Sequence, residues 1–368
     1  ERGRLLYDAP AGALTADLRQ ALSARKSDLL AHLSADGPAP LAFPQQSLWF
    51  LQQLYPQDTS ASEQFAIRIE GPLDARLLAQ AWQALLARHA ILRTSFIERD
   101  GEVWQQAAPP VPDAVALPQL DAGTAPGNLL EIAAAALREP FDLRRGPLLK
   151  PQLCRIDAGQ HVLLVTAHHI IADGLSVPLI REELSALYAA LRRGEPSPLP
   201  AVQLEYADVA LAQGPLDAQR EAGILQRWRE ILARPPAPAL QALVRPPPGP
   251  KVSRRAGFSL EAQLADGLRR LARDCGTTPY VVLLAAFRLL LARLTGQPDL
   301  VIGTPMTLRD RPELRRLIGC LVNPLALRVP LDLQDSFRSQ LRRERAMVLE
   351  VLEYRELPFS RVVAAVSP

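Results

Sequence analysis

The sequence predicts an α/β protein made of two halves with mixed sheets. From residue 41 onward, segments that alternate like strands are followed by segments with the apolar spacing of amphipathic helices. A proline-rich stretch at 235–250 separates two series of similar element order, although no sequence repeat relates them. The 368 residues are 48% hydrophobic and 22% charged, which is enough apolar material for one large or two medium domains.

Composition and charge exclude several classes of protein. The net charge of +3 lacks the basic excess of a dedicated nucleic-acid-binding protein. The longest nearly apolar run, residues 280–291, contains Arg288 and is too short to cross a bilayer. The chain opens without a signal segment, and its three cysteines lie far apart with no C-x-x-C pair. We therefore expect a cytoplasmic protein with reduced thiols. Because the first residue is not Met, we also expect a fragment of a longer polypeptide.

The first 35 residues are expected to form a separate small segment. A short strand at 5–7 precedes a helix that Thr15 can cap and that ends near Leu22. A second helix, with leucines on one face, is expected over 27–33. A piece of this size buries little core, so an adaptor is favoured over an extension of the following domain. Residues 36–40, rich in Pro and Gly, form a linker.

The first half, residues 41–215, alternates strands and helices. After a turn at Gly71, Asp74 can cap the first long helix. The segments with strand-like alternation are 65–70, 91–97, 102–106, 148–156 and 161–167, the last two forming a hairpin. The segments with helical apolar spacing are 77–86, 128–138 and 176–193.

The second half, residues 216–368, repeats this order. Strands are predicted at 256–260, 299–305 and 323–330. Helices are predicted up to Cys275, from Thr278 to just before Gly296, and over 333–350.

Two adjacent histidines, His168 and His169, follow an apolar strand. Consecutive strand residues point to opposite faces, so one imidazole can face a cleft while the other packs inward. By itself, such a pair is more often structural than catalytic. A metal site is disfavoured, because Asp173 is the one nearby carboxylate and no third His or Cys has ligand spacing.

The segment HHIIADG at 168–174 resembles the His-His-x-x-x-Asp-Gly signature of nonribosomal peptide synthetase condensation domains, within the chloramphenicol acetyltransferase-like superfamily. Other segments resemble the remaining motifs of this family, in the family's order. They are PQQSLWFL at 44–51, RHAILRTSF at 88–96, FDL and GPL within 141–148, YAD at 206–208, IGTP at 302–305, IGCLVNPL at 318–325 and YRELPF at 354–359. Leu175 and Cys320 depart from the pattern, since aromatic residues are usual there.

The resemblance implies an α/β (α+β) fold of two chloramphenicol acetyltransferase-like lobes with mixed sheets, arranged as a V-shaped pseudo-dimer. The lobes would span 41–215 and 216–368, and the second is expected to be truncated because the final family motif is missing. Segments 5–10 and 12–15 resemble the end of the N-terminal docking domain of the tubulysin synthetase. This implies that a separate upstream subunit supplies the donor.

The activity implied is acyl transfer from one carrier-bound thioester to the amine of a second, carrier-bound aminoacyl group. His169 would face the cleft and hydrogen-bond the attacking amine, as a base or as an orienting group. The Gly174 N–H would approach the tetrahedral oxygen; its alternative role is a turn glycine with positive φ. His168 would be the inward, structural partner. No Ser or Cys lies in a nucleophile-elbow pattern, so no acyl-enzyme is expected.

Other family positions have structural or substrate-facing roles by resemblance. Asp173 is expected to form a buried salt bridge with Arg88 that shapes the active-site loop, rather than to serve in a triad. Arg93 is expected to be structural, with substrate binding as the alternative. The residues expected along the substrate tunnel are Leu175, Ser176, Thr304 and Asn323. Asn323 could equally be a turn residue at the start of a strand.

Neither a metal nor a bound cofactor is expected, since substrates would arrive on 4′-phosphopantetheine arms. The expected partners are an upstream donor carrier protein on a separate subunit, a downstream acceptor carrier protein and an adjoining adenylation domain; no nucleic acid or membrane is expected. An epimerisation domain is the main alternative, disfavoured by the LWFL segment at 48–51 and by Asn323. A heterocyclisation domain would replace both histidines with aspartates. The non-enzymatic alternative is an inactive scaffold that docks carrier proteins.

Overall fold

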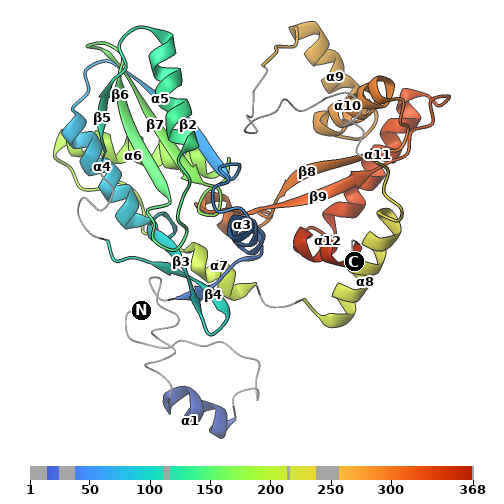
Figure 1. The fold of residues 1–368 in the computed structure, drawn as a ribbon, viewed down its shortest axis with the longest axis horizontal. Coiled ribbons are helices and arrows are strands. Elements are labelled where there is room, and N and C mark those ends of the chain that lie inside the picture. Colours follow the sequence, from blue (N-terminus) through green and yellow to red (C-terminus); the bar gives the residue numbers. More distant parts are fainter. Residues whose placement is uncertain (1–14, 25–37, 111–116, 214–215, 238–256, 367–368) are drawn as a thin grey trace. The chain divides into compact units, whose positions relative to one another are not determined.

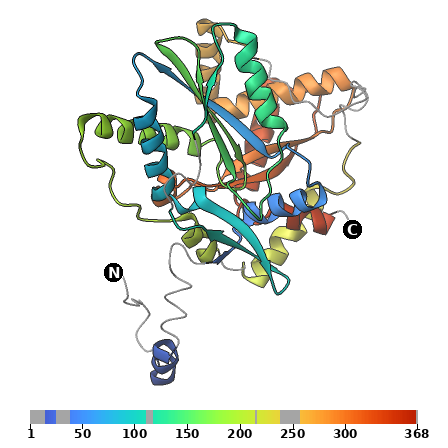
Figure 2. The same ribbon diagram turned by 60° about the vertical axis from the view of Figure 1, so that its left-hand side comes forward.

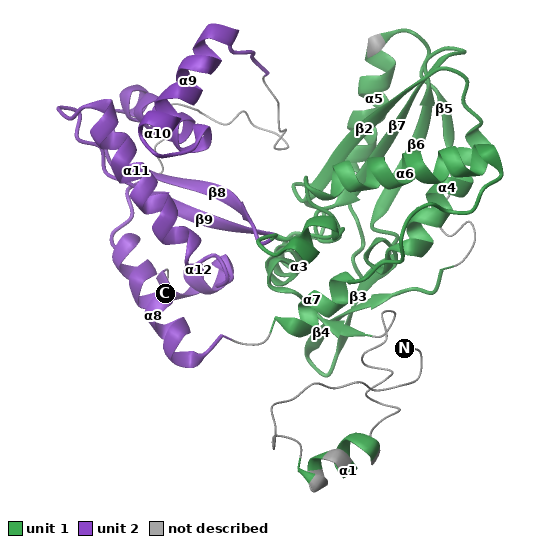
Figure 3. Ribbon diagram, turned by 180° about the vertical axis from the view of Figure 1, so that it is seen from behind, with its two compact units in different colours: residues 1–215, 309–321 green, residues 216–308, 322–368 purple. Residues whose placement is uncertain are grey.

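The described part of the chain divides into two compact units, coloured separately in Figure 3. The computed structural model describes all residues except 1–14, 25–37, 111–116, 214–215, 238–256 and 367–368. Unit 1 comprises residues 1–215 and 309–321, and unit 2 comprises residues 216–308 and 322–368. The expected second lobe, 216–368, is wrong over 309–321, because Arg309 and Gly319 hydrogen-bond to residues of unit 1. The predicted strand at 5–7 and helix at 27–33 lie outside the described residues.

Unit 1 contains a four-stranded mixed sheet in the order β2-β7-β6-β5 (Figure 1). Its strands are β2 (Ser62–Glu70), β5 (Gln119–Asp121), β6 (Leu149–Arg155) and β7 (Gln160–His168). The central strand β7 runs antiparallel to both β2 and β6, as the predicted hairpin requires, whereas β5 runs parallel to β6. The carboxyl end of β7, where the two histidines lie, is therefore held between neighbouring strands.

Helices cover both faces of this sheet. They are α4 (Ala75–Arg88), α5 (Pro126–Arg138) and α6 (Ser176–Arg193). Figure 2 shows α5 on one side of the sheet and α4 on the other. Leu163 and Val165 on one face of β7, and Leu164 and Thr166 on the other, are all buried. Asp74 caps α4 by accepting hydrogen bonds from two backbone N–H groups, as its sequence position predicts.

A second sheet in unit 1 has the order β1-β4-β3. Its strands are β1 (Ala39–Pro40), β3 (Thr94–Arg99) and β4 (Glu102–Ala107). The strand predicted over 91–97 is wrong in its first part, where Ala90–Arg93 forms the 3₁₀ turn η1. Ile91 and Leu92 are both buried on this turn, so consecutive residues point inward, which an alternating strand would not allow.

The described residues of unit 1 also form the α-helices α1 (Ala16–Ala24), α3 (Phe43–Leu54) and α7 (Tyr206–Ala212). The predicted N-terminal helix forms as α1, and the Thr15 hydroxyl accepts from the Leu18 N–H at 3.3 Å.

Unit 2 is built around the antiparallel strands β8 (Val301–Thr307) and β9 (Val322–Arg328). Its helices are α8 (Ala218–Ile231), α9 (Ala262–Asp274), α10 (Pro279–Thr295), α11 (Phe337–Leu352) and α12 (Phe359–Val366). The strand predicted at 256–260 does not form over 257–260, where Phe258 is 87% exposed and contributes nothing to a core. Helix α11 starts later than predicted, because the Ser336 hydroxyl caps it.

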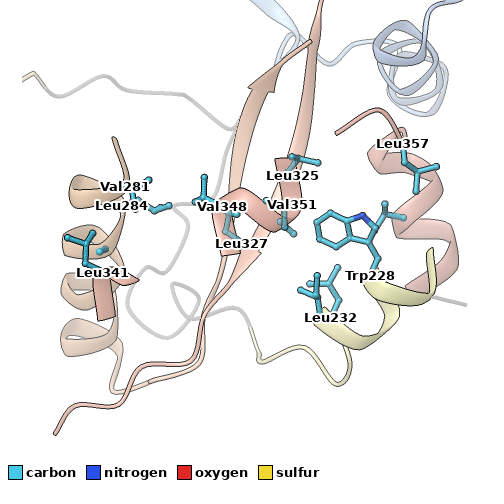
Figure 4. Close-up of a cluster of buried hydrophobic side chains, with 14 of the residues drawn as sticks. Trp228, Leu232, Val281, Leu284, Leu325, Leu327, Leu341, Val348, Val351 and Leu357 are labelled. Carbon is cyan, nitrogen blue, oxygen red and sulfur yellow. The ribbon is translucent and has the colours of Figure 1, made fainter. Parts of the chain in front are cut away.

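The core of unit 2 gathers apolar side chains from several helices and β9 (Figure 4). Trp228 comes from α8, Leu284 from α10, Val351 from α11 and Leu327 from β9, and all four are buried. Burial of such side chains supplies most of the folding free energy of the unit. In the described part of the chain, no single helix is long and apolar enough to cross a membrane; α9 and α10 meet that criterion only as a pair bent by 105°.

One ion pair lies inside unit 2. Arg288 of α10 and Glu344 of α11 are both fully buried and form two parallel hydrogen bonds of 2.8 and 2.9 Å. The same guanidinium donates to the carbonyl oxygens of Leu300 and Leu327, at 2.6 and 3.0 Å. This pairing explains why an arginine interrupts the most apolar segment of the chain.

The Glu344→Leu variant should lose about 3–5 kcal/mol of unfolding free energy, because it leaves a buried guanidinium without its carboxylate. Chemical denaturation measures this loss. The control is Asp266→Ala, which breaks the exposed Arg269–Asp266 pair and should cost under about 1 kcal/mol. Equal losses in the two variants would contradict the importance of the buried pair.

Candidate active site at the end of strand β7

The site is built where β7 ends and the chain turns toward α6. Ser62 of β2 pairs with His168, and the His169 N–H continues the ladder by donating to the Ala61 carbonyl at 2.7 Å. The following Ile170 and Ile171 are fully buried and anchor the loop in the core of unit 1. The alternation at 168–169 therefore sends the two imidazoles in different directions, as the sequence predicts.

His168 is buried and fully hydrogen-bonded. Its Nε2–H donates to the Gln52 side-chain oxygen at 3.2 Å, and its Nδ1 accepts from the Ile170 N–H at 3.1 Å. The Phe141 ring meets it edge-on, with centroids 6.0 Å apart. Burial, together with a smaller effect of the positive charge that His169 can carry, lowers the pKa of His168 to about 4. His168 is therefore a neutral, structural histidine at physiological pH.

His169 is held in one tautomer and remains accessible. Its Nδ1 lies 2.9 Å from the Ala172 carbonyl oxygen, which can only accept, so Nδ1 carries a proton. Nε2 is then the nitrogen with a free lone pair in the neutral ring. The side chain is 27% exposed, and Nε2 lies 3.2 Å from the Glu63 carboxylate of β2. A histidine of this kind can exchange a proton with a ligand at Nε2.

Asp173 is fully buried, and its partner is Arg309 rather than Arg88. The Arg309 guanidinium donates to Asp173 Oδ1 at 2.8 Å. The same oxygen accepts from the backbone N–H and the hydroxyl of Ser176, both at 2.9 Å, and Oδ2 accepts from the Leu321 N–H at 3.0 Å. We call Asp173, Ser176, Arg309 and Leu321 the Asp173 network. It ties the loop between β7 and α6 to residues 309–321.

The expected Asp173–Arg88 salt bridge is wrong. Arg88 ends α4, which packs along α6, and its Nε donates to Glu183 of α6 at 2.9 Å. Glu183 also contacts the His89 Nε2 at 2.7 Å. Burial alone would raise the pKa of Glu183, but the hydrogen bonds and charges of His89 and Arg88 together hold it below its ordinary value. Arg88 therefore stabilises the α4–α6 contact.

Gly319 lets residues 309–321 pass close to Tyr206 of α7. Its φ is +151°, and a Cβ placed there would overlap the Tyr206 ring. The Tyr206 hydroxyl donates to the Cys320 carbonyl at 2.6 Å. Burial raises the pKa of Tyr206 well above its ordinary value, so the hydroxyl keeps its proton. Cys320 is buried beside this contact.

Gly174 and Leu175 lie on the exposed side of the loop. Gly174 is not among the glycines with positive φ, so its alternative role as a left-handed turn residue is wrong. A Cβ built at Gly174 would meet nothing within 4 Å, which leaves the space beside its backbone open. Leu175 is 50% exposed and begins α6 as its N-cap residue.

Several residues predicted to belong to the site are hydrogen-bonded within the fold. Ser176, expected along a tunnel, is fully buried in the Asp173 network. Arg93 donates to the carbonyls of Leu86 and Ala108, which makes it structural.

In unit 2, Thr304 is a buried residue, and its hydroxyl is hydrogen-bonded to the Tyr280 hydroxyl at 2.6 Å. Asn323 is also buried: its amide donates to the carbonyls of Arg355 and Leu357 and accepts from the Phe359 N–H. Asn323 thus clamps the segment 354–359.

Three further residues contact the predicted site residues, although no sequence pattern identifies them: Gln52, Glu63 and Arg309. Arg309 lies 136 residues from Asp173, and no local pattern distinguishes it from the other arginines. Glu63 reaches His169 only because β2 pairs with β7, a register between strands about 100 residues apart. Within the described ranges, no group of three His, Cys, Asp or Glu side chains is placed to hold a metal ion.

Because His168 is buried in its neutral form, the unfolding free energy of the protein should depend on pH. The folded pKa of His168, about 4, lies below the ordinary value of 6.5, so the unfolded chain binds more protons between these values. Unfolding free energy should therefore fall as the pH decreases through this window, by up to about 3 kcal/mol relative to the His168→Asn variant. Urea unfolding at a series of pH values measures it. The same slope in both proteins would argue against a neutral His168.

The pairing of Asp173 is testable by double-mutant cycles. Asp173→Ala and Arg309→Ala should each cost about 3 kcal/mol or more, and the double variant should lose much less than the sum, because each single change strands a buried partner. Asp173→Ala and Arg88→Ala should instead be additive, since these residues share no hydrogen bond. Urea unfolding supplies the free energies. Coupling of Asp173 to Arg88 without coupling to Arg309 would refute the observed pairing.

Nearly the whole chain matches two known protein families. Residues 35–367 match the family "Condensation domain", and residues 1–34 match the "TubC N-terminal docking domain". The chain is 35% identical to a linear gramicidin synthase of Brevibacillus parabrevis, over 98% of this chain and 5% of that protein. It is 39% identical to phosphinothricin tripeptide synthetase PhsC of Streptomyces viridochromogenes, over 89% of this chain and 31% of that protein. The chain thus spans well under two thirds of either relative.

Solved structures share the fold. The first condensation domain of the calcium-dependent antibiotic synthetase, in complex with a substrate analogue, has a TM-score of 0.79 at 22% identity and covers 91% of this chain and 79% of its own. The X-domain in complex with OxyB from teicoplanin biosynthesis has a TM-score of 0.74 at 28% identity, covering 90% and 73%. The chain therefore belongs to the condensation-domain family of nonribosomal peptide synthetases, with a TubC N-terminal docking domain over its first 34 residues.

Proposed function

We propose that this domain forms an amide bond between an upstream carrier-bound acyl or peptidyl thioester and the amine of a downstream carrier-bound aminoacyl group. The observation that supports this most is His169, whose Nδ1–H is fixed on the Ala172 carbonyl while its Nε2 stays accessible. An acceptor amine at Nε2 meets an imidazole nitrogen with a free lone pair, which can accept a proton from it.

In the proposed reaction, the neutral amine attacks the thioester carbonyl carbon. The nitrogen lone pair forms the C–N bond, and the carbonyl π electrons move to oxygen, where the Gly174 N–H can donate. When the carbonyl re-forms, the C–S bond breaks and the sulfur leaves with the bonding pair. The proton that the nitrogen loses passes by way of His169 to the thiolate. No covalent enzyme intermediate is involved, and His169 acts as the base in this scheme.

The proposed partners follow from the family and the docking domain. Both substrates arrive on 4′-phosphopantetheine arms of carrier proteins, so the domain itself binds no cofactor. The docking segment, at residues 1–34, would receive the donor carrier from a separate upstream subunit. The acceptor carrier and an adenylation domain would follow in the same polypeptide.

In an intact module, His169→Ala should lower the rate of amide formation by about 100-fold or more, because it removes the proton-exchanging group. Loading of the carrier proteins should persist. Mass spectrometry of the carrier-bound products, with defined donor and acceptor thioesters, measures both. His161→Gln, on the same strand, is the matched control and should keep its activity.

The same assay separates the alternatives when both donor stereoisomers are supplied. Transfer to the acceptor supports condensation. Scrambling of the donor stereocentre without transfer would instead identify an epimerisation domain. If neither reaction occurs, the domain is identified as an inactive scaffold that docks carrier proteins. Among the related structures, the X-domain is seen in complex with OxyB. An undiminished rate in a folded His169→Ala variant would refute the role of that residue.

A further inference from the structure

We infer that Glu63 binds the ammonium group of the acceptor substrate beside His169, so that the two side chains form a two-point site for a cationic amine. The inference rests on the proposed function and deepens it. Glu63 is a carboxylate of β2 that no sequence motif identifies. The feature of the acceptor that it selects is the positive charge on the nitrogen.

The sheet register places Glu63 next to His169. Glu63 pairs with Ala167, and Ala61 accepts the hydrogen bond from the His169 N–H, so Glu63 and His169 are diagonal neighbours on adjacent strands. Such neighbours project from the same face within reach of long side chains. The Glu63 Oε1 accordingly lies 3.2 Å from the His169 Nε2. A shift of one residue in this register would place Glu63 on the opposite face.

The contact has the chemistry of an ammonium site. Because the Nδ1 proton is committed to Ala172, a hydrogen bond between Nε2 and the carboxylate requires one further proton, shared between the ring and Glu63. In its ion-pair form, the carboxylate faces a positively charged N–H donor. An acceptor ammonium is also a positively charged N–H donor, so it can take the place of the imidazolium opposite Glu63.

Exposure distinguishes Glu63 from the structural carboxylates of the protein. The Glu63 side chain is 41% exposed, whereas Glu183 and Glu344 are buried against arginines and stabilise helix contacts. A partly exposed carboxylate with a histidine partner can exchange that partner for a ligand. Since an α-amino group has a pKa of about 8, it enters largely as an ammonium at neutral pH. Glu63 would hold it while His169 accepts its surplus proton, leaving a neutral amine beside the ring.

The test compares two acceptors on the same carrier protein in the intact module, one aminoacyl and one α-hydroxyacyl. The hydroxyl nucleophile carries no positive charge. Glu63→Gln keeps the size of the side chain and removes its charge, so KM for the aminoacyl acceptor should rise about tenfold while KM for the hydroxyacyl acceptor stays unchanged. Glu70→Gln makes the same charge change further along β2 and should alter neither value.

The outcomes separate this inference from the proposed function. An unchanged KM for the aminoacyl acceptor in Glu63→Gln, with amide formation intact, would overturn the role of Glu63 alone. An equal loss with both acceptors would also overturn it, since a general distortion of the site does not discriminate by charge. Absence of amide formation by the unaltered module would overturn the proposed function and this inference together.

Discussion

The burial of the Asp173 carboxylate is the constraint on which the loop between β7 and α6, with its candidate site, depends. A carboxylate without water is tolerated only when its oxygens accept hydrogen bonds and its charge is balanced. Arg309 balances the charge, while Ser176 and Leu321 supply further donors. Because Asp173 lies between His169 and the start of α6, the same bonds fix the turn that exposes Gly174. The carboxylate thus contributes to the site by holding its backbone, and the distance of Arg309 along the chain makes residues 309–321 part of unit 1.

The two histidines show how one strand can supply opposite environments. His168 points into packed surroundings with Phe141 and Gln52, where desolvation keeps its pKa low and the ring neutral. His169, one residue later, retains access at Nε2, and a backbone carbonyl selects its tautomer. Neither the low pKa of His168 nor the accessible Nε2 of His169 is an intrinsic property of histidine. Both follow from the alternation of side chains along β7 and from the register that brings Glu63 of β2 to the accessible ring.

Structural features that depend on residues close together in the sequence could be predicted from it. Contacts between residues far apart in the sequence could not. The bounds of α6 and α10, the cap at Asp74 and the β6–β7 hairpin follow from apolar spacing, capping and turn residues. The resemblance to condensation domains also predicted a site at the end of β7, next to His169. The partner of Asp173 was predicted wrongly, because any of many arginines can supply a buried positive charge. The strand at 256–260 was predicted from alternation alone, but a strand needs a neighbour, and alternation does not specify one.

The close passage of Gly319 over Tyr206 has a consequence for the exchange of segments between related domains. Residues 309–321 cannot be transplanted as an independent loop, because their path requires an aromatic ring of defined position beneath the glycine and an arginine at the start to meet Asp173. Four residues therefore depend on one another although they are spread over more than a hundred positions of the sequence: Asp173, Tyr206, Arg309 and Gly319. Chimeric synthetases whose junctions fall between α7 and β9 must take all four from a single parent.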